Sequence, residues 1–433
     1  MRSKAMLISA ILAFSMLISG CKAPTASQLN EEGREEIQLC ISVLDVTMRE
    51  VIADYNRKSD QYEIVPLEYS GDISIEDWRR RIQLELTNEK GPDILSITAL
   101  QGINMKPYAE SGQFLDVTDF LAKQGNIIRA ATEANTIDGR QYGIPFSFSL
   151  NTMVTSSSMA TDRENWTKDY CMQKTEESNT AVFIGAPYGW TREEAGLYTL
   201  NVLGVGMAGI QLFVNEEQGI SSFEQQEFID MLEFAKQYSD PVSGESIKRK
   251  QTSGEKFCTT IGLGNFSDFW YCNALFGGKP VYMGYPSPLG GVHQIIVNSF
   301  YINAASSHKD GALDFMRYLL TEEVLRKLVT EHGEFPVNQT LLESLWQEAQ
   351  KECISTETGY EKNGIFYSPR LMTDEEERIF WEMLKDPIYY QWENDIWDII
   401  WEEALPFFYG EKAAAEVAKI VDSKVQLYLD ERK

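Results

Sequence analysis

The sequence predicts an α/β fold with more than one domain, and three observations carry that prediction. The chain has 433 residues, which is more than a single domain usually holds. Hydrophobic residues make up 43% of it, which is enough for packed cores and argues against a disordered chain. Runs with the two-residue period of a strand alternate with runs at helical spacing, which favours largely parallel sheets flanked by helices.

The beginning of the chain predicts export. Arg2 and Lys4 precede an apolar run over 5–18, which is shorter than the roughly 20 residues that span a bilayer, so we expect a signal peptide rather than a transmembrane helix. The run ends in Ser19-Gly20-Cys21, which resembles the lipobox of bacterial lipoproteins.

That resemblance implies removal of residues 1–20 and attachment of lipid, including palmitate, to Cys21 on the outer face of the cell membrane. The alternative is an ordinary cleaved signal beside a chance cysteine. Residues 21–36 are small, polar and charged, which is typical of a flexible linker.

The first folded part predicts three strands and two helices in alternation. The strands are expected at 37–44, 62–69 and 92–97, and the helices at 47–56 and 78–86. Parallel sheets bind ligands at the carboxyl ends of their strands. Four residues at these ends are candidates for ligand contact: Asp45, Tyr69, Thr98 and Gln101. Each of them has an alternative local role, such as capping a helix or closing a turn.

The remainder predicts a second lobe with more helix. We expect a helix over 223–238 and another that begins after an N-cap at Ser267. A strand is expected over 294–303, followed by one long helix over 309–328. The last sixty residues read as helical. Their acidic stretch over 374–403 is typical of a solvated helix face.

Composition and motifs argue against several functions. The chain has 39 basic and 65 acidic residues, a net charge of -26, which disfavours nucleic-acid binding and a polybasic membrane contact. Its three histidines are too far apart for a local metal motif, and its cysteines form no zinc or disulfide pattern. The glycines at 204, 206 and 209 have dinucleotide spacing but follow a helix-like run. We therefore expect no cofactor.

Six short motifs carry a resemblance to a known family. They lie at 90–95, 111–121, 142–147, 284–286 with 302–306, 333–338, and 399–404 with 409–410. In this order they resemble the substrate-binding lipoproteins of bacterial ABC importers, in the class of maltose- and other sugar-binding proteins called family 1. The motifs cover nearly the whole mature chain.

The resemblance implies a two-lobed periplasmic-binding-protein fold of type II, hinged between the lobes. Lobe one would hold 37–145 and 295–338, and lobe two would hold 146–294 and 339–433. The implied function is capture of a carbohydrate, of the oligosaccharide class, and its delivery to the transmembrane subunits of an ABC permease by hinge closure. The implied protein is a monomer and not an enzyme.

Two alternatives stay open: an exported carbohydrate-active hydrolase, or a ligand-sensing or adhesion lipoprotein on the same fold. A glycosidase needs a pair of carboxylates, and a chain this acidic always offers one. The hydrolase is disfavoured because the matched motifs belong to binding proteins.

Aromatic faces suit the C–H surfaces of a sugar, so three aromatic residues of the second lobe are further candidates. They are Trp190 in a turn-rich stretch, Trp270 after a helix start, and Tyr285 beside a predicted crossing. Trp397 and Trp401 are four residues apart on a predicted helix, and core packing is the preferred interpretation for them.

Overall fold

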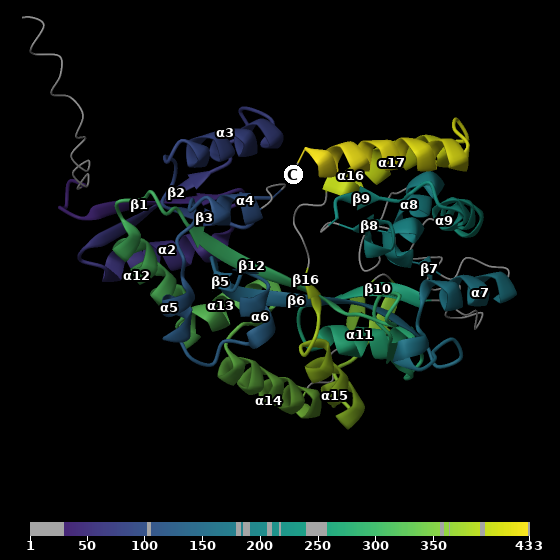
Figure 1. Cartoon of the computed structure of the whole chain (residues 1–433). Helices are drawn as coiled ribbons and strands as arrows, with labels where there is room; N and C mark the ends of the chain where they lie inside the picture. The colour runs from purple at the N-terminus through teal and green to yellow at the C-terminus, as the bar shows by residue number, and fades with distance from the viewer. Residues whose placement is uncertain are drawn as a thin grey trace, which may run out of the picture.

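The computed structural model describes residues 30–101, 105–178, 183–184, 191–205, 210–215, 218–239, 258–355, 359–362, 364–389 and 395–431. The predicted signal peptide, Cys21 and Trp190 lie outside the described residues. The chain forms two lobes side by side, joined by long strands that run through both (Figure 1).

Lobe one contains the first third of the chain and two later helices (Figure 1). Its elements are β1 (Glu35–Ile41), α2 (Val46–Lys58), β2 (Tyr62–Glu68), α3 (Ile75–Thr87), β3 (Ile94–Ser96), α4 (Met105–Glu110), α5 (Thr118–Ala122), α6 (Arg129–Glu133), β4 (Thr136–Ile137), β5 (Arg140–Gln141), α12 (Lys309–Leu319) and α13 (Glu322–His332).

Three segments cross between the lobes: β6 (Gly143–Ser156), β12 (Gln294–Ile302) and β13 (Phe335–Pro336). Lobe two is built mainly from the middle and the end of the chain. Its elements are α7 (Lys168–Ser178), β7 (Phe183–Ile184), α8 (Arg192–Leu200), β8 (Val214–Asn215), β9 (Ile220–Ser221), α9 (Gln226–Tyr238), β10 (Cys258–Leu263), α11 (Ser267–Leu275), β11 (Pro280–Tyr282), β14 (Tyr360–Lys362), β15 (Ile365–Tyr367), β16 (Ile388–Tyr389), α16 (Asp395–Phe408) and α17 (Ala414–Asp430). Below the junction lie α14 (Gln339–Ser355) and α15 (Asp374–Met383) (Figure 1).

The main sheet of the described residues runs through both lobes in the order β2-β1-β3-β12-β6-β10-β7. β1 is parallel to β2 and β3, and β10 is parallel to β7, whereas β12 is antiparallel to β3 and β6. The predicted α/β fold is therefore confirmed, and every antiparallel pair of the main sheet among the described residues includes the crossing strand β6 or β12. The domain boundaries given above stay predictions.

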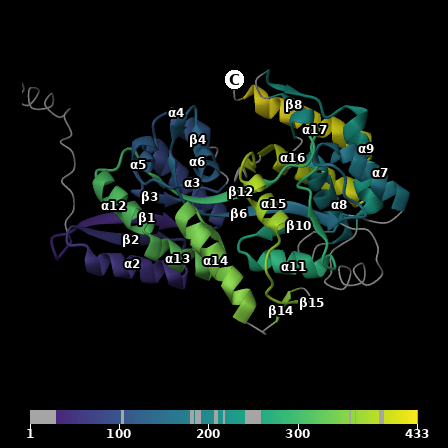
Figure 2. The ribbon, with the colours of Figure 1, turned by 90° about the horizontal axis from the view of Figure 1, so that it is seen from below.

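Helices cover both faces of the lobe-one sheet. They are needed because successive side chains of each strand point to opposite faces, and apolar side chains on both faces must be buried. Leu39 and Ile94 face a core formed with α2, α12 and α13, whereas Cys40 and Leu95 face a core formed with α3. Figure 2 shows α2 and α13 on one side of β1 and β2, with α3 on the other side. This packing fixes the ends of the strands relative to one another.

Two predicted helix boundaries are wrong. The helix expected over 309–328 is two helices, because Thr321 adopts an extended conformation between α12 and α13. The apolar spacing does not reveal this break, because residues on both sides of it are fully buried, such as Phe315 and Leu325. Ser267 is the first residue of α11 rather than its N-cap, and its hydroxyl donates to Oδ1 of Asn265.

The acidic stretch over 374–403 is not entirely a solvated face. Glu376 and Glu403 are only 5% and 9% exposed. Glu376 closes a capping box at the start of α15 and pairs with Arg370, while Glu403 pairs with Lys412 and Lys424. Each burial is offset by an ion pair, as a buried carboxylate requires.

Several expected absences can be compared with the described residues. There, no disulfide bond joins the cysteines, and no cluster of side chains is suited to a metal ion. In the same part of the chain, no helix is both long and apolar enough to span a bilayer. Trp397 and Trp401 pack on the core of lobe two, which confirms the interpretation as core residues.

Candidate functional site

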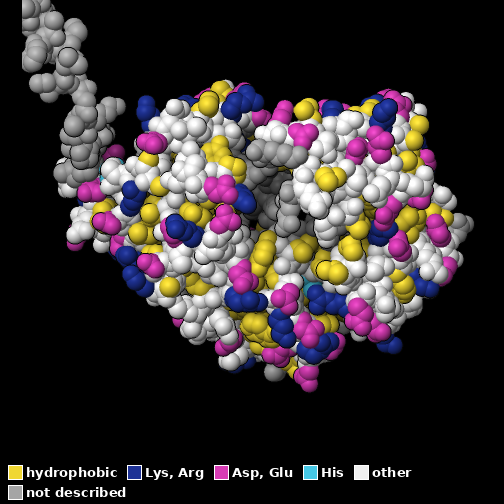
Figure 3. All heavy atoms as spheres, viewed as in Figure 1, with side chains coloured by type: hydrophobic (Ala, Val, Ile, Leu, Met, Phe, Trp, Pro, Cys, Tyr) yellow, Lys and Arg dark blue, Asp and Glu magenta, His cyan; other side chains and the backbone are white. Residues whose placement is uncertain are grey.

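The surface is hollowed between the two lobes, with hydrophobic side chains at the base of the hollow (Figure 3). Below, this hollow is called the cleft. The crossing strands β6 and β12 run beneath it and pair from Gly143↔Tyr301 to Asn151↔Gln294, with a register shift at Asn298 and Ser299. A bulge of this kind bends a strand and increases its twist, which suits a segment that joins two bodies.

A carboxylate ties the three crossing segments together beside this bulge. Ser147 of β6 donates to Oε2 of Glu334, and Nδ2 of Asn298 of β12 lies 2.8 Å from Oε1 of the same residue. Nδ2 of Asn298 also lies 3.2 Å from the hydroxyl oxygen of Ser147. Glu334 directly precedes β13, so a single side chain holds all three crossings in register.

Strand direction decides which part of lobe one faces the cleft. β12 enters lobe one from lobe two, and β3 is antiparallel to it, with Ser96 opposite Phe300. The carboxyl end of β3 therefore points toward lobe two, and those of its parallel neighbours β1 and β2 do the same. This edge is where ligands of parallel sheets bind.

Asp45 follows β1 at this edge and has two local partners. Its carboxylate accepts a hydrogen bond from the backbone N–H of Met48 at 2.9 Å and so caps α2. Nε2 of His332 lies 3.1 Å from its other oxygen. Burial alone would raise the pKa of Asp45, but the Met48 hydrogen bond and His332 outweigh burial and hold the pKa below its usual value. The side chain is still 45% exposed.

The other three lobe-one candidates lie along the same edge. The hydroxyl of Tyr69 donates to the carbonyl of Ile73, and the Tyr69 ring packs 5.7 Å from that of Trp78. Thr98 lies beside Ser96, with 3.0 Å between their hydroxyl oxygens. Oε1 of Gln101 accepts a hydrogen bond of 2.7 Å from Arg79. All four lobe-one candidates retain exposed surface.

Arg79 is a further candidate at this edge that the sequence did not identify. Its guanidinium reaches from α3 to Gln101, and more loosely to the carbonyl of Thr98 at 3.5 Å. Its Nε is buried and has no hydrogen-bond partner among the described residues. A buried donor without a partner costs free energy, so a rearrangement that brought an acceptor to this atom would be stabilising. Arg79 is the first of three successive arginines, so sequence alone could not single it out.

The aromatic candidates of lobe two are placed differently. Trp270 is 4% exposed, and its ring lies 6.4 Å from that of Tyr360 in the hairpin β14–β15. That hairpin and α11 lie together on one side of lobe two (Figure 2). Tyr285 is fully buried in the core of lobe two, and its backbone pairs with Val292. Neither ring presents a free face in this conformation.

Comparisons with known proteins agree with the two-lobed α/β fold. A family model described as "Bacterial extracellular solute-binding protein" matches residues 50–352. Searching curated protein sequences gave no match. Solved structures match over nearly the whole chain, at sequence identities so low that they show the fold alone.

Three of these structures illustrate the likeness. The sugar-binding protein MalE from Xanthomonas citri has a TM-score of 0.58 and 13% identity, over 92% of this chain and 98% of its own. An ABC transporter solute-binding protein from Thermotoga lettingae, bound with α-D-tagatose, has a TM-score of 0.55 and 16% identity, over 91% and 99%. The ABC substrate-binding protein Lmo0181 from Listeria monocytogenes, in complex with cycloalternan, has a TM-score of 0.55 and 14% identity, over 91% and 99%.

Proposed function

Because the chain belongs to the bacterial extracellular solute-binding proteins, whose family model matches residues 50–352, we propose that it captures a carbohydrate in the cleft between its lobes. We propose further that the sugar is an oligosaccharide and is delivered to the transmembrane subunits of an ABC permease. Two of the similar structures are bound to sugars by name, tagatose and cycloalternan, and the third is a sugar-binding protein. The family consists of binding proteins, which favours binding over catalysis.

The observation that carries the proposal is the polar edge of lobe one. Asp45, Thr98, Gln101 and Arg79 together offer carboxylate, hydroxyl, amide and guanidinium groups on the side that faces lobe two. Such planar and hydroxyl groups can both donate to and accept from the hydroxyls of a sugar. Tyr69 adds an aromatic ring at the same edge.

The stacking face from lobe two is proposed to come from Trp190. Trp270 and Tyr285 would have to be uncovered before they could lie against a ligand, since they are 4% and 0% exposed. A pyranose ring gains from a flat aromatic face only where that face is open to it.

Closure of the lobes would couple capture to delivery. A ligand that contacts both walls of the cleft binds the closed form better than the open form, and this difference drives closure. The crossing strands would bend at their bulge, beside the hydrogen bonds that Glu334 accepts from Ser147 and Asn298. The closed form would then dock on the permease.

The proposed anchor is a lipid on Cys21. It is supported by the lipobox resemblance and by the extracellular character of the family. A Cys21→Ser chain should be released from the membrane fraction of a producing cell and should not incorporate labelled palmitate. Retention of the Cys21→Ser chain in that fraction would contradict the anchor.

The direct test of the function is a thermal-shift panel on a form that begins at Lys22. The panel holds monosaccharides, oligosaccharides, amino acids, polyamines and metal chelates. A ligand at a hundredfold excess over its Kd stabilises the folded state by about 2.7 kcal/mol, which gives a clear rise in Tm. A rise with one class of sugar supports the proposal, and a rise only with a non-sugar overturns the substrate. Recovery of the sugar in shortened form would instead favour the hydrolase.

A further inference from the structure

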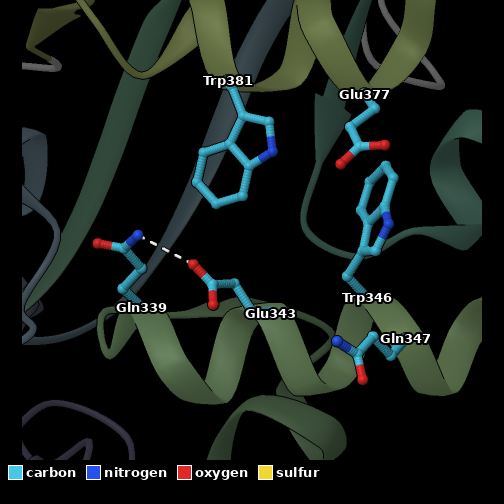
Figure 4. A pocket seen from close by; sticks show the side chains of 6 residues that line it. All are labelled: Gln339, Glu343, Trp346, Gln347, Glu377 and Trp381. Carbon is cyan, nitrogen blue, oxygen red and sulfur yellow. Dashed lines mark hydrogen bonds between the residues drawn. The ribbon is translucent and has the colours of Figure 1, made fainter. Parts of the chain in front are cut away.

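A pocket of about 360 Å³ lies outside the cleft, between α14 and α15. Its walls come from both helices (Figure 4). The residues that line it are Gln339, Glu343, Trp346 and Gln347 of α14, with Glu377 and Trp381 of α15. None of the candidate residues of the cleft is among them.

The indoles of Trp346 and Trp381 form opposite sides of this pocket, and each packs against a buried phenylalanine. Trp346 packs edge-on against Phe266, with ring centroids 4.9 Å apart, and Trp381 packs on Phe380 at 5.2 Å. Phe266 and Phe380 are buried in the core beneath. Each indole is half-buried, so one part rests on the core while the rest faces the open space seen in Figure 4.

Each indole also has a carboxylate nearby from the opposite helix. Glu377 reaches down from α15 toward Trp346, and Glu343 lies below Trp381 (Figure 4). The carboxylate of Glu343 accepts a hydrogen bond from Nε2 of the neutral Gln339 at 2.9 Å, and it has no ion pair with a described residue.

Two arginines near the pocket are engaged elsewhere. Arg378, one residue after Glu377, pairs with Glu375 and Glu382 on the exposed side of α15. Arg370 pairs with Glu376 at the start of the same helix. No lysine or arginine is among the described residues that line the pocket. Two carboxylates therefore lie near two indoles, and the described lining residues include no basic side chain.

We propose that this pocket binds an organic ammonium ion, a quaternary or alkyl-substituted amine. A cation over an indole is attracted by the negative face of the ring, and tryptophan is the strongest side chain for this interaction. The two carboxylates add a Coulombic attraction that a neutral ligand does not receive. The volume is much larger than a bare inorganic ion needs and leaves room for alkyl groups. This inference is independent of the sugar proposed for the cleft.

Choline is the probe, and its uncharged analogue 3,3-dimethyl-1-butanol is the matched control ligand. The nine tryptophans give indole N–H signals in a two-dimensional ¹H–¹⁵N spectrum, which Trp346→Phe and Trp381→Phe would assign. Choline should shift those two signals in a saturable way, and the alcohol should not. Added salt should weaken choline binding because the carboxylates are exposed.

The variants separate charge from folding. The double variant Glu343→Gln, Glu377→Gln keeps the shape of the pocket and should weaken choline binding by about tenfold. Asp374→Asn removes one charge from the same helix outside the pocket and should leave the Kd nearly unchanged.

Three outcomes would overturn the proposal. They are equal binding of choline and the alcohol, unchanged affinity in the double variant, and saturable shifts with a neutral disaccharide but not with choline. The last outcome would identify a surface sugar site instead. None of them bears on the ligand of the cleft, which is measured separately by the panel on the same chain.

Discussion

Arg79 differs from the next arginine in what its guanidinium touches. Arg79 reaches Gln101 at the edge of the cleft, whereas Arg80 pairs with Asp77 on its own helix at 3.1 Å. We expect Arg79→Ala to weaken sugar binding by tenfold or more, because a buried charge-assisted hydrogen bond contributes about 1.5–3 kcal/mol. Arg80→Ala is the matched control and should bind normally. Isothermal titration with the sugar found by the panel gives both values, and equal loss in the two variants would remove Arg79 from the site.

Asp45 links the stability of lobe one to pH. Its pKa is held below the ordinary value of 3.8, so the charged carboxylate stabilises the fold above that pH. This contribution is lost as the pH falls through the lowered pKa. Asp45→Asn keeps a capping side chain but no charge, and Asp45→Ala loses both. At pH 7 we expect the Ala variant to lose about 1 kcal/mol of unfolding free energy and the Asn variant to lose less.

Urea denaturation between pH 7 and pH 3 measures this effect. The difference between the native chain and Asp45→Asn should shrink toward pH 3 as the native carboxylate takes up its proton. A difference that stays constant over this range would show that the charge of Asp45 contributes nothing to folding.

At this scale, sequence reasoning worked where backbone pattern decides position. Asp45 and Thr98 could be placed at the cleft edge because they follow strands, and the ends of parallel strands meet at one edge. The aromatic candidates could not be placed, because Trp270 and Tyr285 are buried by elements distant in sequence, as the contact with Tyr360 shows. Arg79 could not be distinguished from Arg80 because both occupy one helix.

Elements are fitted together closely where β10 meets the end of α13. A Cβ on Gly264, just after β10, would lie 2.0 Å from the carbonyl oxygen of Gly333. Gly333 ends α13 in the left-handed conformation, at φ 66°, and immediately precedes Glu334. The close approach therefore joins a loop of lobe two to the third crossing.

Gly264→Ala should be strongly destabilising because its Cβ meets backbone, which cannot move aside as a side chain can. Gly277→Ala is the control, since Gly277 has φ 60° but nothing within 4 Å of the added carbon. We expect about 1 kcal/mol for Gly277→Ala and at least twice that for Gly264→Ala, measured by urea denaturation. If both variants lost a similar amount of unfolding free energy, the close contact between Gly264 and Gly333 would not contribute to stability.

The helix boundaries show what local pattern leaves out. Apolar spacing predicted α2, α3 and α9 to within a few residues, because each has a continuous buried face. It missed the break between α12 and α13 because both helices bury their apolar residues toward lobe one. The break depends on the backbone of Thr321, which no hydrophobic period reports.

The whole molecule depends on the tie between its three crossings. Glu334→Ala would leave the fully buried hydroxyl of Ser147, and Asn298, without their carboxylate acceptor. We expect a loss of about 2 kcal/mol in unfolding free energy and a larger radius of gyration of the unliganded chain in X-ray scattering. Glu331→Ala, at an exposed position of α13, is the control. A variant with the native radius and stability would show that the tie does not hold the lobes.

The order in which the chain visits the lobes also constrains how it can fold after export. The core of lobe one joins β1 to α12 and α13, and α13 ends at His332. Along the chain, α12 and α13 come only after the crossing strand β6 and much of lobe two, namely α7, α8, α9 and β10. Until then, the sheet of β1, β2 and β3 lacks two of the helices that cover one of its faces, and only α2 of the three is present there. Lobe one therefore stays incomplete until residue 332 is available, so this extracellular chain cannot finish folding its first lobe from its N-terminal third alone.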